Sequence, residues 1–115
     1  MIYITIERRA EEEPAITSYR VEGHAMYADP GKDIVCSAVS AITVGTVNSV
    51  EVLTGQILGA EMEEGWLEVI VPSDLPDSSA AQVQLLLESM VVMLSSIEDN
   101  YGDYITLQTT YGKGG

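Results

Sequence analysis

The sequence is short of cationic side chains, has a single cysteine and a single histidine, and contains no phenylalanine. Five Lys and Arg stand against 18 Asp and Glu, giving a formal net charge of -13, so nucleic-acid backbones and anionic membranes would repel this surface. One cysteine excludes an intramolecular disulfide framework and, with the acidic balance, indicates a reducing compartment. Without Phe, one Trp and six Tyr supply every aromatic ring, which disfavours a base-stacking platform.

Two kinds of segment are also missing. No basic region followed by an apolar core and a small-residue cleavage site is visible at the start of the chain, so we expect a cytoplasmic protein without a secretory signal. The longest uncharged stretch, residues 34–50, contains several Ser and Thr side chains and lies at the lower limit for a bilayer span. A buried helix fits it better. The length suits one domain, residues 1–115, with enough chain to bury a core.

Alternating apolar residues predict five strands. In the first, Ile2, Ile4 and Ile6 fall on one face at period two. A charged turn then leads into a second strand, so the first two strands form a hairpin. Glu64-Gly65 joins two further strands into a second hairpin. The strands are expected over residues 2–8, 15–23, 57–63, 66–71 and 104–110.

Helical spacing predicts two helices, over residues 33–55 and 79–97. Asp33 offers an N-cap for the first, and Gly55 offers a C-terminal stop. Its many β-branched residues would also allow a strand, but its length exceeds that of ordinary strands and decides for a helix. Ser79 to Gln82 has the form of a capping box ahead of the clearest amphipathic pattern in the chain.

The order β-β-α-β-β-α-β predicts an α+β fold, in which one mostly antiparallel sheet carries both helices on one face. Trp66, Ile70 and several Tyr point to the opposite face of that sheet. We therefore expect a homodimer in which a second subunit covers part of this apolar surface.

The only histidine and the only cysteine flank one loop. His24 follows Gly23 at the end of the second strand, and Cys36 lies three residues beyond the expected N-cap, Asp33. At the third position of a helix, unpaired backbone N–H groups and the positive end of the helix dipole favour a thiolate. If the loop folds back, His24 could take the thiol proton, and the same N–H groups could stabilise an oxyanion.

Each of these residues also has a second interpretation. Cys36 could be a small buried hydrophobe, and His24 an ordinary surface or core group. Asp33 could cap the helix or orient His24 as the third member of a triad. Ser40, four residues after Cys36 on the same helix face, could touch the site or bond back to the helix. A metal site is disfavoured, because one thiolate and one imidazole without paired spacing do not make a zinc site.

The segment from Gly23 to Ser40 resembles a known family. The residues that carry the resemblance are Gly23-His24-Ala25, Tyr27-Ala28, Gly31, Asp33-Ile34-Val35-Cys36-Ser37-Ala38-Val39-Ser40 and Asn48-Ser49. They are similar to the ribosomal-processing cysteine proteases of the Prp (YsxB-like) family. The resemblance implies a homodimeric protease that removes the N-terminal extension of ribosomal protein bL27 and needs no cofactor. It further implies that Cys36 is the nucleophile and His24 the general base, with Gly23, Asp33 and Ser40 supporting them.

Two other functions stay compatible with these residues. An acidic dimer could hold a cationic ribosomal protein during ribosome assembly without cutting it, since opposite charge steers such partners together. Alternatively, Cys36 could be oxidised to a sulfenic acid in a thiol redox sensor, although the chain has no second cysteine to resolve it. The acidic surface could also serve solubility alone.

Overall fold

The computed structural model describes residues 1–23 and 30–112, with side chains described from residue 34 onward in the first helix. Five strands and two helices follow one another in the order β-β-α-β-β-α-β, as the sequence predicts. The elements are β1 (Ile2–Arg8), β2 (Ile16–Glu22), α1 (Pro30–Thr54), β3 (Gly59–Glu63), β4 (Trp66–Ile70), α2 (Asp77–Tyr101) and β5 (Ile105–Tyr111).

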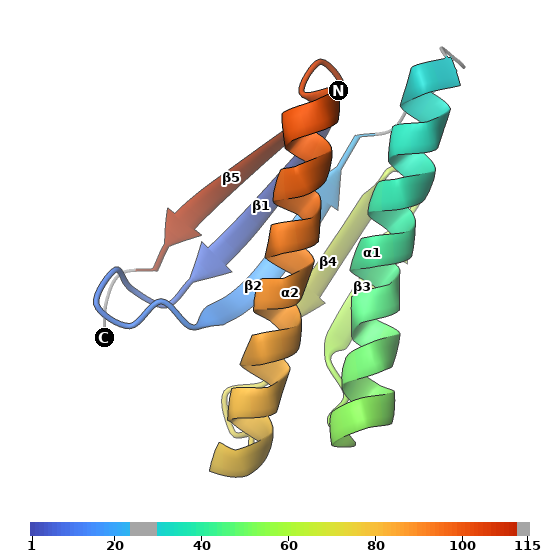
Figure 1. Cartoon of the computed structure of the whole chain (residues 1–115). Helices are drawn as coiled ribbons and strands as arrows, with labels where there is room; N and C mark the ends of the chain where they lie inside the picture. Colours follow the sequence, from blue (N-terminus) through green and yellow to red (C-terminus); the bar gives the residue numbers. More distant parts are fainter. Residues whose placement is uncertain (24–29, 113–115) are drawn as a thin grey trace.

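The strands form one mixed sheet in the order β3-β4-β2-β1-β5. Strands β1 and β5 pair in parallel, whereas the other neighbouring strands pair antiparallel. Both helices lie on the same face of the sheet, α1 in front of β3 and β4 and α2 in front of β1 and β2 (Figure 1). The predicted α+β fold with a mostly antiparallel sheet is therefore confirmed.

The period-two pattern of β1 is confirmed by its burial. Ile2, Ile4 and Ile6 are each at most 4% exposed and face the helices. Val39 from α1 and Leu87 from α2 pack into the same core. A single hydrophobic layer between the sheet and the helices therefore holds the fold together, because burying apolar side chains supplies most of the free energy of folding.

Helix α1 is confirmed despite its β-branched residues, but it begins at Pro30, before Asp33. Proline suits the first turn of a helix because its missing N–H would be unpaired there anyway. The expected N-cap role of Asp33 is therefore wrong. Buried Thr43 and Thr46 are accommodated because their hydroxyl groups donate to helix carbonyl oxygens one turn earlier, at 2.8 and 2.6 Å.

Helix α2 begins at Asp77, so the capping box expected over 79–82 is also wrong. Pro76 precedes the helix, and no side chain caps it. The Ser79 hydroxyl instead accepts a hydrogen bond of 3.4 Å from the Gln56 amide. This contact joins the start of α2 to the segment that follows α1. Tertiary packing thus outweighed a local capping signal.

By length and mean hydropathy, residues 34–54 and 77–101 could each cross a bilayer. In this fold, however, both helices turn one side toward the sheet, and α1 buries Val39 and Val50 there while α2 buries Leu87 and Leu94. Core helices of this length meet the same two criteria. The buried helix expected over 34–50 packs into the core accordingly.

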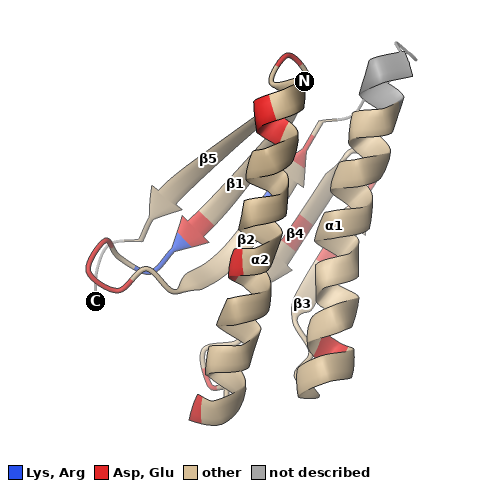
Figure 2. Cartoon of the chain, viewed as in Figure 1, with Lys and Arg blue, Asp and Glu red and all other residues tan. Residues whose placement is uncertain are grey.

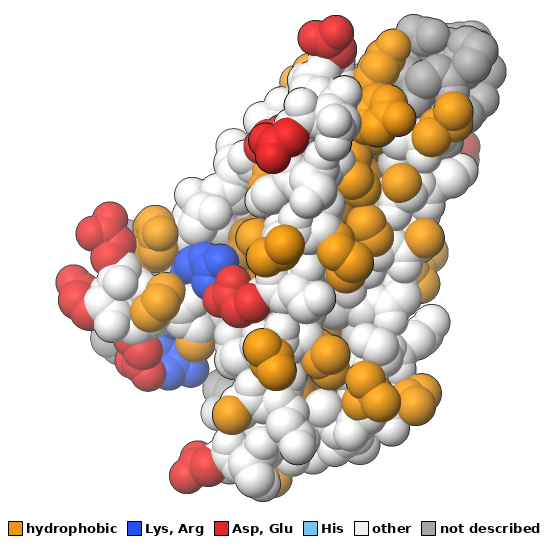
Figure 3. All heavy atoms as spheres, in the orientation of Figure 1, with side chains coloured by type: hydrophobic (Ala, Val, Ile, Leu, Met, Phe, Trp, Pro, Cys, Tyr) orange, Lys and Arg blue, Asp and Glu red, His pale blue; other side chains and the backbone are white. Residues whose placement is uncertain are grey.

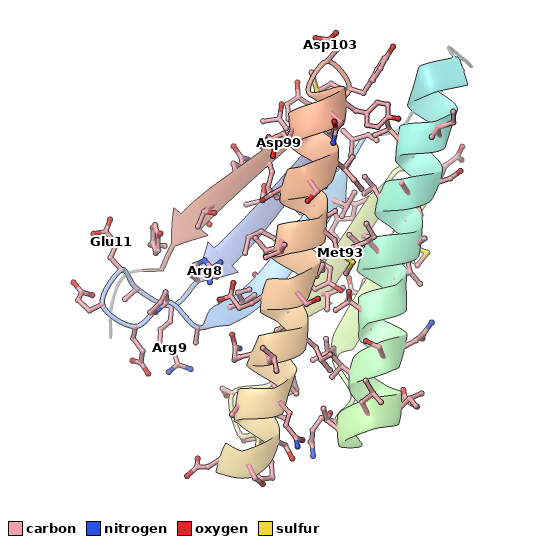
Figure 4. All side chains as sticks on the ribbon, in the orientation of Figure 1. Arg8, Arg9, Glu11, Met93, Asp99 and Asp103 are labelled. Carbon is pink, nitrogen blue, oxygen red and sulfur yellow. The ribbon has the colours of Figure 1, made fainter. Side chains whose placement is uncertain are left out.

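One ion pair ties the end of β1 to α2. Arg8 donates to both carboxylate oxygens of Glu88, at 2.6 and 2.9 Å, and also to the carbonyl oxygen of Pro14 at 2.9 Å. Figure 4 shows Arg8 between the strand and the helix. The hydrogen bond with Arg8 holds the pKa of Glu88 below its usual value, and the same bond raises the pKa of Arg8. Partial burial opposes both changes to a smaller degree.

Replacing Glu88 by Gln should lower the free energy of unfolding by about 1 kcal/mol at pH 7, as for a bidentate pair that is partly open to solvent. Because the pKa of Glu88 is lowered in the folded state, the pair stabilises the protein fully above pH 4.5, the usual value. That contribution is lost as the pH falls through the lowered pKa. Urea unfolding of both proteins between pH 3 and pH 7, roughly the range over which carboxylates titrate, should show the difference shrinking toward the acid end. A difference independent of pH would contradict this.

Candidate active site

Cys36 is the seventh residue of α1 and lies half-buried against the core. The sequence pattern predicts Cys36 in the first turn of the helix, and that expectation is wrong by about one turn. The stabilising effect of a helix N-terminus on an anion falls off within the first turn, and only the first four N–H groups lack helical partners. Cys36 therefore lies beyond the turn of α1 whose N–H groups lack helical partners.

Cys36 borders a cavity of about 160 Å³ between α1 and one end of the sheet. We call it the Cys36 cavity. Residues of α1 form one wall, and the ends of β1 and β2 together with the β3–β4 hairpin form the other. The lining residues are Ile2, Val21, Gly23, Cys36, Val39, Ser40, Thr43, Val44, Met62, Glu63, Gly65, Trp66 and Leu67. A cavity of about 150 Å³ holds a benzene molecule, so there is room for one side chain of a peptide beside the thiol.

Gly23 lies at the cavity and directly precedes His24 in the chain. Its backbone lines the Cys36 cavity, and His24 is the next residue in the chain. His24 itself lies outside the described residues. The described structure thus brings the chain to the mouth of the cavity one residue before the only imidazole.

Only glycine fits at position 23. Its φ of +92° lies in the left-handed region that side chains disfavour, and a Cβ there would collide with the carbonyl oxygen of Met1. The Gly23 N–H donates to the Gly65 carbonyl oxygen at 2.9 Å, which holds the end of β2 against the β3–β4 turn. The backbone at Gly23 is therefore constrained beside the cavity, which is compatible with the supporting role predicted for it.

The two other predicted supporting residues both lie on α1. Ser40 lines the Cys36 cavity one turn after Cys36, so it lies on the same side of the helix, as expected. Asp33 is the fourth residue of the helix and precedes Cys36 by about one turn. Its position inside α1 leaves the orienting role as the open interpretation of the two proposed for it.

A buried hydrogen bond fixes α1 beside the cavity. The hydroxyl group of Tyr19, on β2, donates to the Thr43 carbonyl oxygen at 2.7 Å, and both side chains are fully buried. Burial also raises the pKa of Tyr19 well above its usual value, so the hydroxyl stays protonated and able to donate. Thr43 lines the Cys36 cavity, and this bond therefore sets the distance between the helix wall and the sheet.

The β3–β4 hairpin supplies five residues of the lining, from Met62 to Leu67, and the sequence pattern predicts no part in the site for it. Trp66, the only Trp, was assigned simply to the outer face of the sheet. Trp66 was the residue that could have indicated this wall of the cavity, because a lone Trp next to a Gly turn is an unusual surface residue. Spacing along the chain could not reveal that the hairpin ends beside α1.

A metal centre finds no support in the described side chains: among residues 1–23 and 34–112, no group of three or more His, Cys, Asp and Glu could hold an ion.

Comparison with known proteins agrees with a thiol-based site. The family model for "Cysteine protease Prp" matches residues 1–106. The chain therefore belongs to the Prp family of cysteine proteases. The ribosomal processing cysteine protease Prp of Bacillus subtilis is 36% identical over 111 residues, covering 95% of this chain and 97% of that protein. The Prp of Staphylococcus aureus is 31% identical over 104 residues, covering 90% and 96%.

Solved structures share the fold over nearly the whole chain. A Streptococcus mutans protein superposes with a TM-score of 0.84 at 30% identity, covering 96% of this chain and 95% of that one. The S. aureus Prp in complex with a substrate peptide gives 0.82 at 28% identity, covering 96% and 100%. A further S. aureus Prp structure contains a covalently linked product peptide. The resemblance found in the sequence is confirmed, and this Prp chain is a cysteine protease.

Gly23→Ala should destabilise this Prp by at least about 2 kcal/mol, because the left-handed backbone costs roughly 1–2 kcal/mol and the Met1 carbonyl must move as well. Gly45→Ala on α1 is the matched control. A Cβ at Gly45 meets nothing within 4 Å, and alanine should stabilise the helix by about 0.5–1 kcal/mol. Urea unfolding measures both variants. Equal effects of the two substitutions would show that position 23 is not constrained.

Proposed function

We propose that this protein is a cysteine endopeptidase that removes the N-terminal extension of ribosomal protein bL27, with Cys36 as nucleophile and His24 as general base. One observation carries the proposal: Cys36 opens onto a cavity of about 160 Å³ that is also lined by Gly23, the residue directly before His24. The relatives named as ribosomal processing proteases support the substrate. The whole chain, residues 1–115, then works as one protease domain in the cytoplasm.

The chemistry follows from the two groups. His24 takes the proton of the Cys36 thiol, and the resulting imidazolium stabilises the thiolate. The sulfur attacks the scissile carbonyl carbon, and His24 returns the proton to the leaving amine as the peptide bond breaks. Water, deprotonated by His24, then hydrolyses the thioester and restores the thiol. No step requires a cofactor.

The supporting residues position the base and the substrate. Gly23 sets the direction in which the chain leaves β2 before His24, since only glycine adopts its backbone conformation there. Asp33 orients the imidazole by accepting its second N–H, as the third member of a triad does. Ser40 contacts the substrate from the wall of the Cys36 cavity that α1 forms.

Cys36→Ala should abolish cleavage of bL27 that carries its extension, and His24→Ala should lower the rate by about 10²–10⁴-fold, the usual contribution of a general base. The rate is read from the masses of the two products after mixing purified proteins. Ser37→Ala is the control, because Ser37 neighbours Cys36 on α1 but is exposed. It should cleave at the wild-type rate.

Intact bL27 after incubation with the wild-type protein would overturn the proposal. If the two proteins nevertheless formed a stable complex, the result would favour the non-catalytic acidic dimer that holds a cationic ribosomal protein. Loss of a single oxidisable thiol signal with peroxide, again without cleavage, would favour the redox sensor.

The homodimer is part of the same proposal, and the charge distribution favours its formation through the helices. Glu88 is the only charged residue between Asp77 and Glu98 on α2, and Leu85, at 72% exposed, and Val92 project to solvent there. Figure 2 shows only acidic residues, widely spaced, on the described parts of the two helices, and Figure 3 shows apolar side chains gathered over both. Met93 extends from α2 on the side of α1 (Figure 4).

The sequence pattern instead predicts the second subunit on the outer face of the sheet, where Ile70 is 50% exposed. Leu85→Glu and Ile70→Glu add the same charge to the two faces, and Glu is well tolerated in a helix. We expect Leu85→Glu to convert the dimer into a monomer in sedimentation equilibrium, while Ile70→Glu stays dimeric. The reverse result would move the interface to the sheet, and a wild-type monomer would remove it.

A further inference from the structure

Strand β3 forms an open edge of the sheet. It pairs with β4 on one side, and the strand order places no strand on its other side among the described residues. All five of its residues are exposed. An open edge presents backbone N–H and C=O groups that can pair with another extended chain.

The register shows which groups these are. Val71 N–H donates to the Thr17 carbonyl oxygen at 2.9 Å, so the odd-numbered residues around β4 pair with β2 and the even-numbered ones pair with β3. In the β3–β4 register, Glu61 lies opposite Glu68, and therefore Glu61 pairs with β4. Ala60 and Met62 then direct their N–H and C=O groups away from the sheet, at the spacing that an added strand requires.

This edge ends at the Cys36 cavity. Met62 and Glu63, the last two residues of β3, both line the cavity together with Cys36. The Met62 side chain is on the helix side of the sheet, opposite Leu67, and is 61% exposed. A strand added along β3 would cover Met62 and would bring its main chain to the rim of the cavity that Cys36 also lines.

The negative charge of the β3–β4 hairpin determines which kind of extended chain can pair with β3. Residues 59–70 contain four Glu and no Lys or Arg. Among the side chains that the structure describes, Arg20 lies 3.9 Å from Glu68 and also pairs with Glu22. A second copy of β3 would bring Glu61 and Glu63 against their own counterparts, and like charges on adjacent strands destabilise pairing. An extended segment rich in Lys or Arg would be attracted instead.

We propose that the substrate of this protease binds as an additional strand along β3, with its main chain paired to Ala60 and Met62 and its cationic side chains beside Glu61, Glu63 and Glu64. The proposal rests on the function proposed above, since it assigns the path of the peptide to that site. Main-chain pairing supplies affinity without regard to sequence, and the carboxylates select a cationic segment.

Amide hydrogen exchange tests the pairing directly. The Cys36→Ala protein is mixed with a synthetic peptide that spans the bL27 extension and the residues after it, and exchange is followed by NMR. The amides of Ala60 and Met62 should exchange at least about tenfold more slowly with saturating peptide, because each gains a hydrogen-bond partner. The amide of Val69, between β4 and β2, is the reference and should not change. Unchanged exchange at Ala60 and Met62, or no binding of the peptide, would overturn the proposal.

A charge reversal tests the selectivity. Glu61→Lys should lower kcat/KM for the same peptide by about threefold to tenfold at low salt, and the loss should shrink at high salt. Glu11→Lys is the matched control, since Glu11 is exposed in the loop between β1 and β2, away from α1 (Figure 4). With a peptide whose Lys and Arg are replaced by Gln, the two variants should be equal. Equal losses with the cationic peptide would contradict the proposal.

The two proposals fail separately. If the wild-type protein cleaves bL27 but Ala60 and Met62 gain no protection, the peptide takes another path and the protease function stands. If the two amides are protected but the wild-type protein leaves the peptide intact, β3 binds a cationic strand and the catalytic proposal falls.

Discussion

The packing of α1 on the sheet is the constraint on which the site depends. One side of the helix buries Val35, Val39 and Val50, and the Tyr19 hydroxyl anchors the Thr43 carbonyl from beneath. Because these contacts hold α1 along its length, the position of Cys36 relative to the ends of the strands is fixed. A thiol on a loop would need separate contacts to reach the same place.

The Cys36 cavity lies where a long helix and shorter strands meet at one end of the molecule. Helix α1 continues past the ends of β1 and β2, and the β3–β4 hairpin turns back beneath it. Gly23 and Gly65 approach through their backbones there, at 2.9 Å, which leaves space that side chains do not fill. Cys36, the end of β2 that leads to His24 and the open edge of β3 therefore share one end of the sheet.

The local patterns that proved reliable were those that burial enforces. Ile2, Ile4 and Ile6 alternate because one face of β1 is in the core, and the turn at Glu64-Gly65 was confirmed because glycine supplies the positive φ. The predicted starts of the two helices, at Asp33 and at Ser79, were wrong. A cap contributes only about 1 kcal/mol, and the packing of a 25-residue helix outweighs it.

The sequence alone determined the order of elements and the fold class, because periodicity is a property of neighbours along the chain, and the residues around His24 and Cys36 carried the resemblance to the family. The roles of Cys36 as nucleophile and His24 as base stay predictions. The supporting roles of Gly23, Asp33 and Ser40 are what the resemblance implies, and they also stay predictions. Only the tertiary structure decided that Cys36 is a turn inside α1 and that Met62, Glu63 and Trp66 form the other wall of its cavity. Contacts between residues that are 26 or more positions apart in the sequence depend on how strands and helices pack. A pattern of neighbouring residues does not show which of them meet in space.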